Sequence, residues 1–368
     1  MRPLAQGNYT TSQVKAALHA ANRELKFRYD LLDSSNVFKR TLNNVLFGHV
    51  ENNALADIKR IAQFTLTDDT TINFLVDRIQ PWCLVKMSDG NFVEWPLGVF
   101  LMSSPKRRAL ATGSVIREVD AYDLLQILMD DMVADRYTVT AGTNYIVALK
   151  TLLDSAGLTS QNLTSTTSVL PASLDWAPGE SKLRIANDLL GAINYKSLTI
   201  DETGRAVAQP YVLPSLRASD YMYEDNDLSV IFPEVEQFLD LFGVPNKWVR
   251  VVSEADQAVI TSTYTNSNTA SPTSTVNRGR TIVDFGTETG VDQATLDAKV
   301  QRAAFEASQV YEGVELETAI MPMHSDADMI TLKFSTLGIS ANYSEVSWSF
   351  DLAAGCRMRH TVRKVVSI

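Results

Sequence analysis

The segment richest in chemically useful side chains is Met321-Pro322-Met323-His324-Ser325-Asp326-Ala327-Asp328. One imidazole, His324, and two carboxylates, Asp326 and Asp328, could hold a divalent cation, because such nitrogen and oxygen atoms are common metal ligands. The same residues also suit a polar turn between two strands, the first ended by Pro322 and the second begun by Asp328. We favour the turn, and therefore assign no metal, cofactor or catalytic residue to this segment.

A second acidic run, Tyr223-Glu224-Asp225-Asn226-Asp227, has carboxylates at a spacing that calcium can use. It lacks the central glycine and the distal glutamate of an EF-hand loop, so we interpret it as a solvated loop. The other histidines, His19, His49 and His360, are far from His324 in the sequence. No local spacing therefore predicts a histidine site.

Enzyme motifs are missing from the sequence. It contains no phosphate-binding GxxxxGK[ST], no GxGxxG, no HExxH and no GxSxG. A pair of carboxylates for glycoside hydrolysis cannot be recognised among 43 acidic residues. Cys83 and Cys356 occur in apolar contexts without a CxxC pattern and are expected to be small buried residues. The five tryptophans lie mostly in strand-like runs and are expected in the core or an interface. We therefore expect a protein that is not an enzyme and needs no cofactor.

The overall composition is that of a folded protein, with 45% hydrophobic and 21% charged residues. A length of 368 residues favours two to four subdomains, at the usual size of such units. The formal net charge of −10 disfavours stable nucleic-acid binding, although like charge lets DNA pass without sticking. No apolar run is long enough for a membrane span, and the N-terminus lacks the apolar core of a signal peptide, so synthesis in the cytosol is expected.

The first third of the chain is expected to form an arm and a β domain. Residues 11–22 have helical periodicity and a capping Thr11 or Ser12, which predicts a helix in an N-terminal arm over 1–23. Alternating apolar residues predict a barrel or sandwich over 24–118, with strands at 24–32, 58–66, 82–87, 92–103 and 115–119. Pro96-Leu97-Gly98 predicts a bend inside the fourth of these strands.

Three helical patterns follow, at 120–132, 143–156 and from Pro178 onward, and they predict a helical insert over 119–194. A second β region over 195–368 is expected to contain a hairpin at 195–212, a strand at 247–252, a long helix at 292–311 and four C-terminal strands. The polar segment 261–278 is expected to be an exposed, flexible loop. The predicted fold class is thus α+β, mainly β, with two barrel-like domains separated by helices.

Several short patterns occur in the order found in bacteriophage tail hub and minor tail proteins, and over residues 24–368 the chain resembles that family. They are the Gly98-Val99-Phe100 strand ended by Ser103-Ser104-Pro105, Asp120–Gln126, Tyr137–Gly157, Trp176–Gly179 with Leu189-Leu190 and Ile193–Tyr195, Pro322-x-His324 with Asp328, Trp348-Ser349, and Arg363–Val366. The resemblance lies in the order of the patterns and transfers no catalytic residue.

The resemblance implies a structural component of a phage tail tip or baseplate, located in the virion. In this family, two related barrel-like domains from each of three subunits form a ring of pseudo-sixfold symmetry, which adapts the tail tube to the tip and gives passage to DNA. The implied partners are two further copies, a distal tail or tail-tube protein, the tape measure protein, and a tip fibre or receptor-binding protein. Larger members end in a peptidase or fibre, whereas this sequence ends after its second β region, so a hub alone is expected.

The resemblance suggests roles for the basic turn and for the acidic residues. Lys106-Arg107-Arg108 would be a solvated or partner-facing turn, and acidic residues would gather on the ring lumen.

Two other functions are compatible with the sequence. One alternative is a receptor-binding, adhesin-like tail protein with an exposed aromatic platform. The other is a cell-wall hydrolase with two close carboxylates in a cleft. The 261–278 segment would serve docking or recognition.

Overall fold

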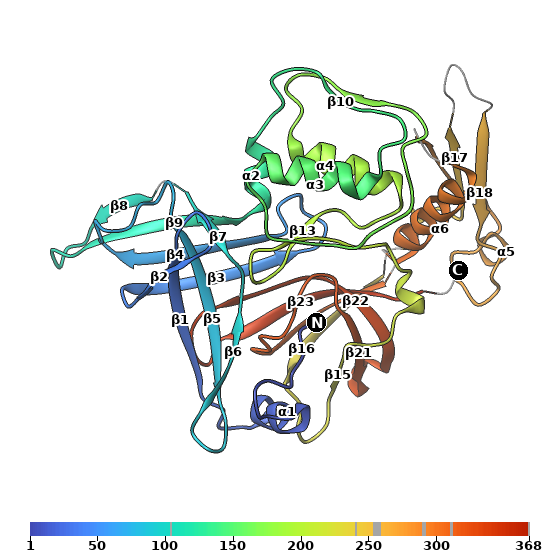
Figure 1. Cartoon of the computed structure of the whole chain (residues 1–368). Helices are drawn as coiled ribbons and strands as arrows, with labels where there is room; N and C mark the ends of the chain where they lie inside the picture. The colour runs from blue at the N-terminus through green and yellow to red at the C-terminus, as the bar shows by residue number, and fades with distance from the viewer. Residues whose placement is uncertain (104, 240, 253–258, 289–291, 310–311, 367–368) are drawn as a thin grey trace.

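The computed structural model describes residues 1–103, 105–239, 241–252, 259–288, 292–309 and 312–366 (Figure 1). Strands dominate, as predicted, and fifteen of them form one large sheet. Its principal order is β16-β20-β23-β22-β3-β4-β9-β7-β5-β1-β2, with β6, β8, β15 and β21 attached beside this path. The fold is therefore mainly β, and strands from both ends of the sequence share a sheet.

The strands from the first third of the chain are β1 Leu25–Leu32, β2 Phe38–Leu42, β3 Val45–Asn53, β4 Arg60–Thr67, β5 Arg78–Lys86, β6 Phe92–Pro96, β7 Phe100–Met102, β8 Lys106–Ala109 and β9 Val115–Asp123. Those from the last part are β15 Tyr221–Glu224, β16 Ile231–Leu239, β20 Glu312–Ala319, β21 Met329–Phe334, β22 Ile339–Asp351 and β23 Arg357–Lys364. The two sets join where β22 pairs with β3, with Trp348 opposite Asn52. One hydrophobic core contains residues of both sets.

The N-terminal arm packs against this core through its helix α1, Thr11–His19. Val14 and Leu18 of α1 are fully buried. The predicted helix is confirmed, but its cap is Thr10, whose side chain accepts a hydrogen bond from the backbone of Gln13. The arm is thus a packed part of the fold.

The predicted bend at Pro96-Leu97-Gly98 is confirmed as the break between β6 and β7, which both pair with β5. Gly98 has a φ of +138°, a conformation that residues with a Cβ rarely adopt. A Cβ at this position would lie 2.8 Å from Arg60 Cδ and from the Phe100 ring. Only glycine fits here, and the chain turns toward β9, the next partner of β7.

The helical region contains α2 Leu125–Asp130, α3 Tyr145–Ser155 and α4 Lys182–Ala192, with a separate buried core. Two small sheets accompany it, one of β10 Tyr137–Val139 with β12 Leu174–Trp176, the other of β11 Gln161–Leu163, β13 Thr199–Ile200 and β14 Ala206–Ala208. The helix predicted from residue 120 begins later, because β9 continues to Asp123 with Val119, Ala121 and Asp123 buried. Among the described helices, none has the length and apolar character needed to cross a membrane.

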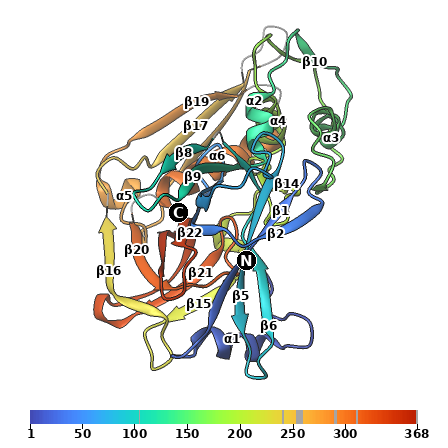
Figure 2. The same ribbon diagram turned by 90° about the vertical axis from the view of Figure 1, so that its left-hand side faces the viewer.

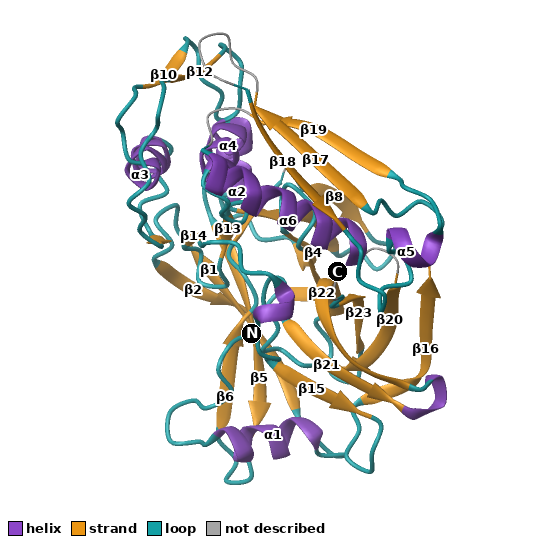
Figure 3. Cartoon of the chain, turned by 90° about the vertical axis from the view of Figure 1, so that its right-hand side faces the viewer, coloured by secondary structure: helices purple, strands orange, loops and turns teal. Residues whose placement is uncertain are grey.

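The strands predicted at 195–212 and 247–252 pair outside the large sheet. The 195–212 hairpin pairs with β11 beside the helices, and β17 Lys247–Val252 pairs with β18 Ile260–Thr265 and β19 Val283–Glu288. Neither joins the C-terminal strands, which pair instead with β15 and β16. Helix α6, Gln293–Gln309, covers the three-stranded sheet through Val300 and Ala304, which pack on Trp248 (Figure 3). The short helices η1 Pro214–Leu216, α5 Thr275–Arg278 and η2 Ser335–Leu337 complete the described elements.

The expectation of an exposed loop over 261–278 was wrong. Residues 260–265 form β18, and Asn266 and Ser274 are fully buried. Asn266 donates to Ser271 Oγ, while the neighbouring Asn246 donates to the carbonyls of Thr273 and Arg280. Polar side chains can be buried when they take the place of backbone partners, and composition alone did not reveal this.

Candidate functional site

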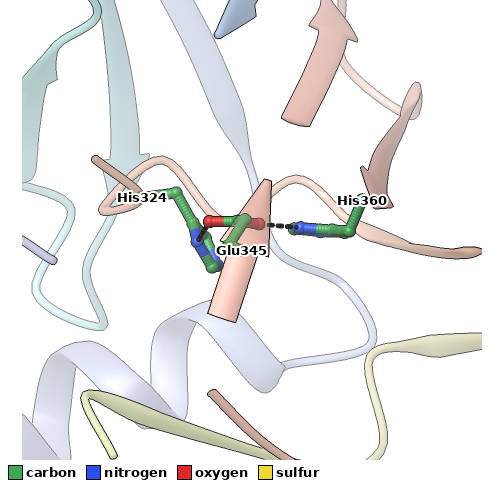
Figure 4. Close-up of side chains that lie close together, drawn as sticks. All are labelled: His324, Glu345 and His360. Atoms are coloured by element: carbon green, nitrogen blue, oxygen red, sulfur yellow. Dashed lines mark hydrogen bonds and ion pairs between the residues drawn. The ribbon is translucent and has the colours of Figure 1, made fainter. Parts of the chain in front are cut away.

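Two of the distant histidines meet in the interior, on either side of one glutamate (Figure 4). His324 follows β20, Glu345 lies on β22 and His360 lies on β23. Glu345 Oε2 is 2.6 Å from His324 Nδ1, and its Oε1 is 2.6 Å from His360 Nδ1. All three side chains are 2% exposed or less. We call these three residues the buried histidine network.

The outer atoms of this network also have partners. His324 Nε2 lies 2.6 Å from the Tyr223 hydroxyl, and His360 Nε2 lies 2.8 Å from Thr318 Oγ1. Asp328 Oδ2 lies 3.3 Å from His324 Nδ1 and accepts a hydrogen bond from the Ser325 backbone. Its Oδ1 forms an ion pair with the Met1 α-amino group. The network therefore connects β15, β20, β22 and β23 with the loop between β20 and β21.

The charges of the network follow from burial and close contact. Burial acts to lower the pKa of His324, but Glu345 and Asp328 outweigh it and raise the pKa to about 9. Burial acts to raise the pKa of Asp328, yet His324 and the Met1 amine hold it at about 2. Burial lowers the pKa of His360, and the pKa of Glu345 stays below its usual value because of both imidazoles. At neutral pH, a His324 cation therefore sits between two carboxylates.

The donor set His324, Glu345 and His360 has atoms within 4.8 Å of one another, which is close enough to suggest a metal centre. Two ligand atoms on one tetrahedral zinc ion are about 3.4 Å apart, given zinc bonds of about 2.1 Å. The separations of 2.6 Å between Glu345 and each histidine are hydrogen-bond distances instead. All four ring nitrogens have partners, so the geometry fits a closed polar network that fixes adjacent strands.

The sequence predictions for these residues fared differently. The 321–328 segment connects two strands, as predicted, but His324 and Asp328 are buried in it. Oδ1 of Asp326 is buried as well and has no hydrogen-bond partner within the described chain. In the acidic run, Tyr223 and Glu224 belong to β15, and Tyr223 is 1% exposed, so a solvated loop was wrong for them. Asp225 accepts hydrogen bonds from Ser335.

Glu345 and Thr318 were missed by the sequence analysis because their partners are remote along the chain. Glu345 is 21 positions from His324 and 15 from His360. The only signal was a charged residue within an alternating strand, Tyr343–Leu352, where one face had to be buried. Such a carboxylate requires a buried partner, but the pattern does not show which residue supplies it.

The opposite face of the same strands carries a second feature, a groove of about 620 Å³ across β16, β20, β23, β22 and β3. Its charged lining residues are Glu51, Glu234, Glu236, Glu315, Glu317 and Arg359. Arg359 pairs with Glu317 at 3.1 Å, whereas the structure gives the other four glutamates no ion pair among its described residues. We call this surface the acidic groove.

Solved structures with a similar fold are known, although no family model and no curated sequence matches the chain. A tail protein of Neisseria meningitidis has a similar structure, with a TM-score of 0.66 and 12% identity, covering 92% of this chain and 97% of that one. The 43 kDa tail protein of prophage MuSo2 from Shewanella oneidensis has a TM-score of 0.61 and 12% identity, covering 91% and 98%.

The Escherichia coli c3393 protein is also similar, with a TM-score of 0.51 and 9% identity, covering 94% of this chain and 77% of that one. It is described as a component of the type VI secretion system with structural similarity to the T4 phage tail proteins gp27 and gp5. The chain therefore has the fold of phage tail and baseplate hub-like proteins, as the resemblance implied. At these identities the likeness concerns the fold.

Proposed function

We propose that this protein is a structural component of a bacteriophage tail tip or baseplate. The observation that carries the proposal is the similarity to tail proteins, which extends over more than nine-tenths of this chain and of the two tail proteins compared. The proposal rests on analogy of the whole fold and not on a shared catalytic site, since a fold alone does not determine function.

We further propose that three copies form the hub ring that adapts the tail tube to the tip, with residues 24–118 and the C-terminal part of 195–368 as its two related β units. The helical insert 119–194 would lie beside them, and the arm 1–23 would brace the core. The neighbours would be the tail-tube or distal tail protein, the tape measure protein and a tip fibre or receptor-binding protein. The tail tip of the virion would be its location, after synthesis in the host cytoplasm.

The acidic groove supports a role in DNA passage. A ring whose lumen carries unpaired glutamates, of which the groove offers Glu51 and Glu315, repels the phosphate backbone and lets DNA move through without binding. In the ring that we propose, this sheet face would point to the lumen. The role requires no catalysis and no cofactor.

The adhesin-like alternative expects an exposed aromatic platform. Trp95, Trp248 and Trp348 are at most 2% exposed and Trp176 is 8% exposed, so these tryptophans serve the core. The hydrolase alternative expects two unpaired carboxylates in a substrate cleft, and the groove glutamates could supply them. A zymogram on purified cell wall separates that role from the structural one.

The first experiment is light scattering after size exclusion, with negative-stain class averages of the same peak. Rings of three copies with a central hole are expected, either from the protein alone or after addition of its tail-tube partner. A species that stays monomeric at high concentration and with that partner would contradict the hub proposal.

A further inference from the structure

The large sheet contains one continuous layer with two open ends. Its order is β16-β20-β23-β22-β3-β4-β9-β8, and each neighbouring pair is antiparallel. Within the described residues, β16 pairs only with β20, and β8 pairs only with β9. Figure 2 shows β16 at the margin of the sheet, and Figure 1 shows β8 and β9 projecting at the far side. Unpaired strand edges invite another strand.

The two ends are compatible in direction. Because the layer has eight strands and every neighbour is antiparallel, β8 and β16 run in opposite directions. Rotation about an axis roughly parallel to the strands keeps strand direction. In a ring, β8 of one copy would therefore meet β16 of the next as an antiparallel neighbour, which continues the pattern of the layer.

The side chains of the two ends also lie on the same face. The strand register runs from Glu317 through Arg359, Ser349, Glu51 and Ile61 to Tyr122. Side chains alternate along a strand, so Glu118 lies on the same face as Tyr122, and Glu315 lies on the same face as Glu317. Glu236 is directly opposite Glu315 and therefore lies on this face too. Lys106 is opposite Glu118 and belongs to this face as well, together with Arg108.

The charges at the two ends are opposite. Glu236 of β16 is directly opposite Glu315 of β20, and like charges in this position destabilise a sheet. Neither has an ion pair among the described residues, and Glu234 beside them has none either. On β8, all four residues are exposed, and Lys106 has no ion pair within the described chain, while Arg108 has an exposed pair with Glu118. Each end thus has charges that the other can neutralise.

We propose that β8 of one copy pairs edge to edge with β16 of the next copy, and that Lys106 and Arg108 then contact Glu234 and Glu236. The inference rests on the proposed ring and names the surfaces that close it. It is a heterologous contact, in which each copy offers both surfaces and three copies leave no open end in this layer. The pairing removes the repulsion between Glu236 and Glu315 and buries two strand edges.

The other open edges are less suited to this contact. The N-terminal arm covers β6, where Gln6 accepts from the Glu94 backbone and Arg2 donates to the Pro96 carbonyl. Helix α1 contacts β15, through His19 and Tyr221. The β2 edge remains open, but its cations are already used, since Lys39 pairs with Asp77 at 2.8 Å and Arg40 pairs with Asp69 at 2.7 Å.

Charge reversal in the full-length chain tests the contact. The double variants K106E/R108E and E234K/E236K are each expected to raise the dissociation constant of the ring at least tenfold, measured by light scattering over a concentration series. Combining all four changes restores the opposite charges and is expected to restore the ring. The control R136E/K150E changes the net charge as much as K106E/R108E, at exposed cations of the helical region, and is expected to leave the ring intact.

Disulfide cross-linking separates this contact from a rival contact at β2. With K106C/E234C or K106C/E236C, oxidation is expected to give covalent dimers and trimers on a non-reducing gel, whereas K39C/E236C and the single variants give monomer. Two outcomes would overturn the β8–β16 contact and leave the hub function standing. One is that K106E/R108E and E234K/E236K both form rings as the wild type does, and the other is that only K39C/E236C gives cross-linked species. A wild-type chain that does not self-associate, alone or with its tail-tube partner, would contradict the hub function. Absence of the 106–234 and 106–236 links under conditions in which the wild-type ring forms would refute the contact.

Discussion

The inner and outer faces of β20, β22 and β23 differ in whether their glutamates have partners within the chain. On the inner face, Glu345 has both oxygens bonded to imidazoles and is fully enclosed. On the outer face, Glu315 is opposite another glutamate and forms no ion pair with a described residue. A buried charge needs hydrogen bonds or an opposite charge within its own chain, whereas an exposed charge is solvated by water until a partner binds. Complete pairing suits a structural role on the inner face, and the unmatched charge of the outer face is what the proposed contact between copies would neutralise.

The strongest test of this comparison is to remove one glutamate from each face. Glu345→Ala leaves the His324 charge buried beside one remaining carboxylate and is expected to reduce the free energy of unfolding by about 3–5 kcal/mol. Glu315→Ala, on the outer face of β20, leaves no buried charge unpaired and should change it by less than about 1 kcal/mol. Urea unfolding followed by fluorescence measures both, and similar losses for the two variants would contradict the distinction.

The second test uses pH. His324 has a folded pKa of about 9, above the ordinary histidine value of 6.5. Its contribution to stability is therefore complete below pH 6.5 and is lost as the pH rises through 9. The difference in unfolding free energy between wild type and His324→Gln should shrink by about 3 kcal/mol over this interval. A difference that stays constant from pH 6 to pH 9.5 would show that His324 is neutral in the folded protein.

A smaller effect is expected on the outer face. Glu236→Gln removes the repulsion with Glu315 and should increase the unfolding free energy of the single copy by about 0.2–1 kcal/mol. The gain should decrease in high salt, because exposed charges are screened. Thermal unfolding at two salt concentrations measures it. Glu180→Gln, which loses an ion pair with Arg184 at 2.9 Å, is the comparison and is expected to change stability in the opposite direction. A loss of stability in Glu236→Gln would mean that Glu236 has a favourable partner within its own chain.

The smallest expected effect concerns metal. Because the buried histidine network is closed by hydrogen bonds, zinc or a chelator should shift the unfolding midpoint by less than about 1 °C. A zinc ion present at a hundredfold excess over its dissociation constant would stabilise the fold by about 2.7 kcal/mol, a shift of several degrees. Such a shift, abolished by His360→Gln, would make the inner face a metal centre.

Local patterns predicted local features well. The proline and glycine of the 96–98 bend, and the helical periodicity of α3 and α4, act within a few residues, so they can be recognised in the sequence directly. The buried histidine network joins residues 21 and 15 positions apart, and the strand order joins segments as much as 302 positions apart, so no local spacing encodes either. The 261–278 segment misled because composition reports how polar a segment is and not whether its polar groups find partners.

The junction of β3 with β22 has a consequence for synthesis. His49 and Asp351, bonded across it, are 302 positions apart. At about 5–20 residues per second, the ribosome needs roughly 15–60 seconds between the two strands. During that time β3 has one unpaired edge, and closing so long a loop is slow compared with local folding. The edge of β3 that pairs with β22 is therefore open to other strands until β22 has been synthesised.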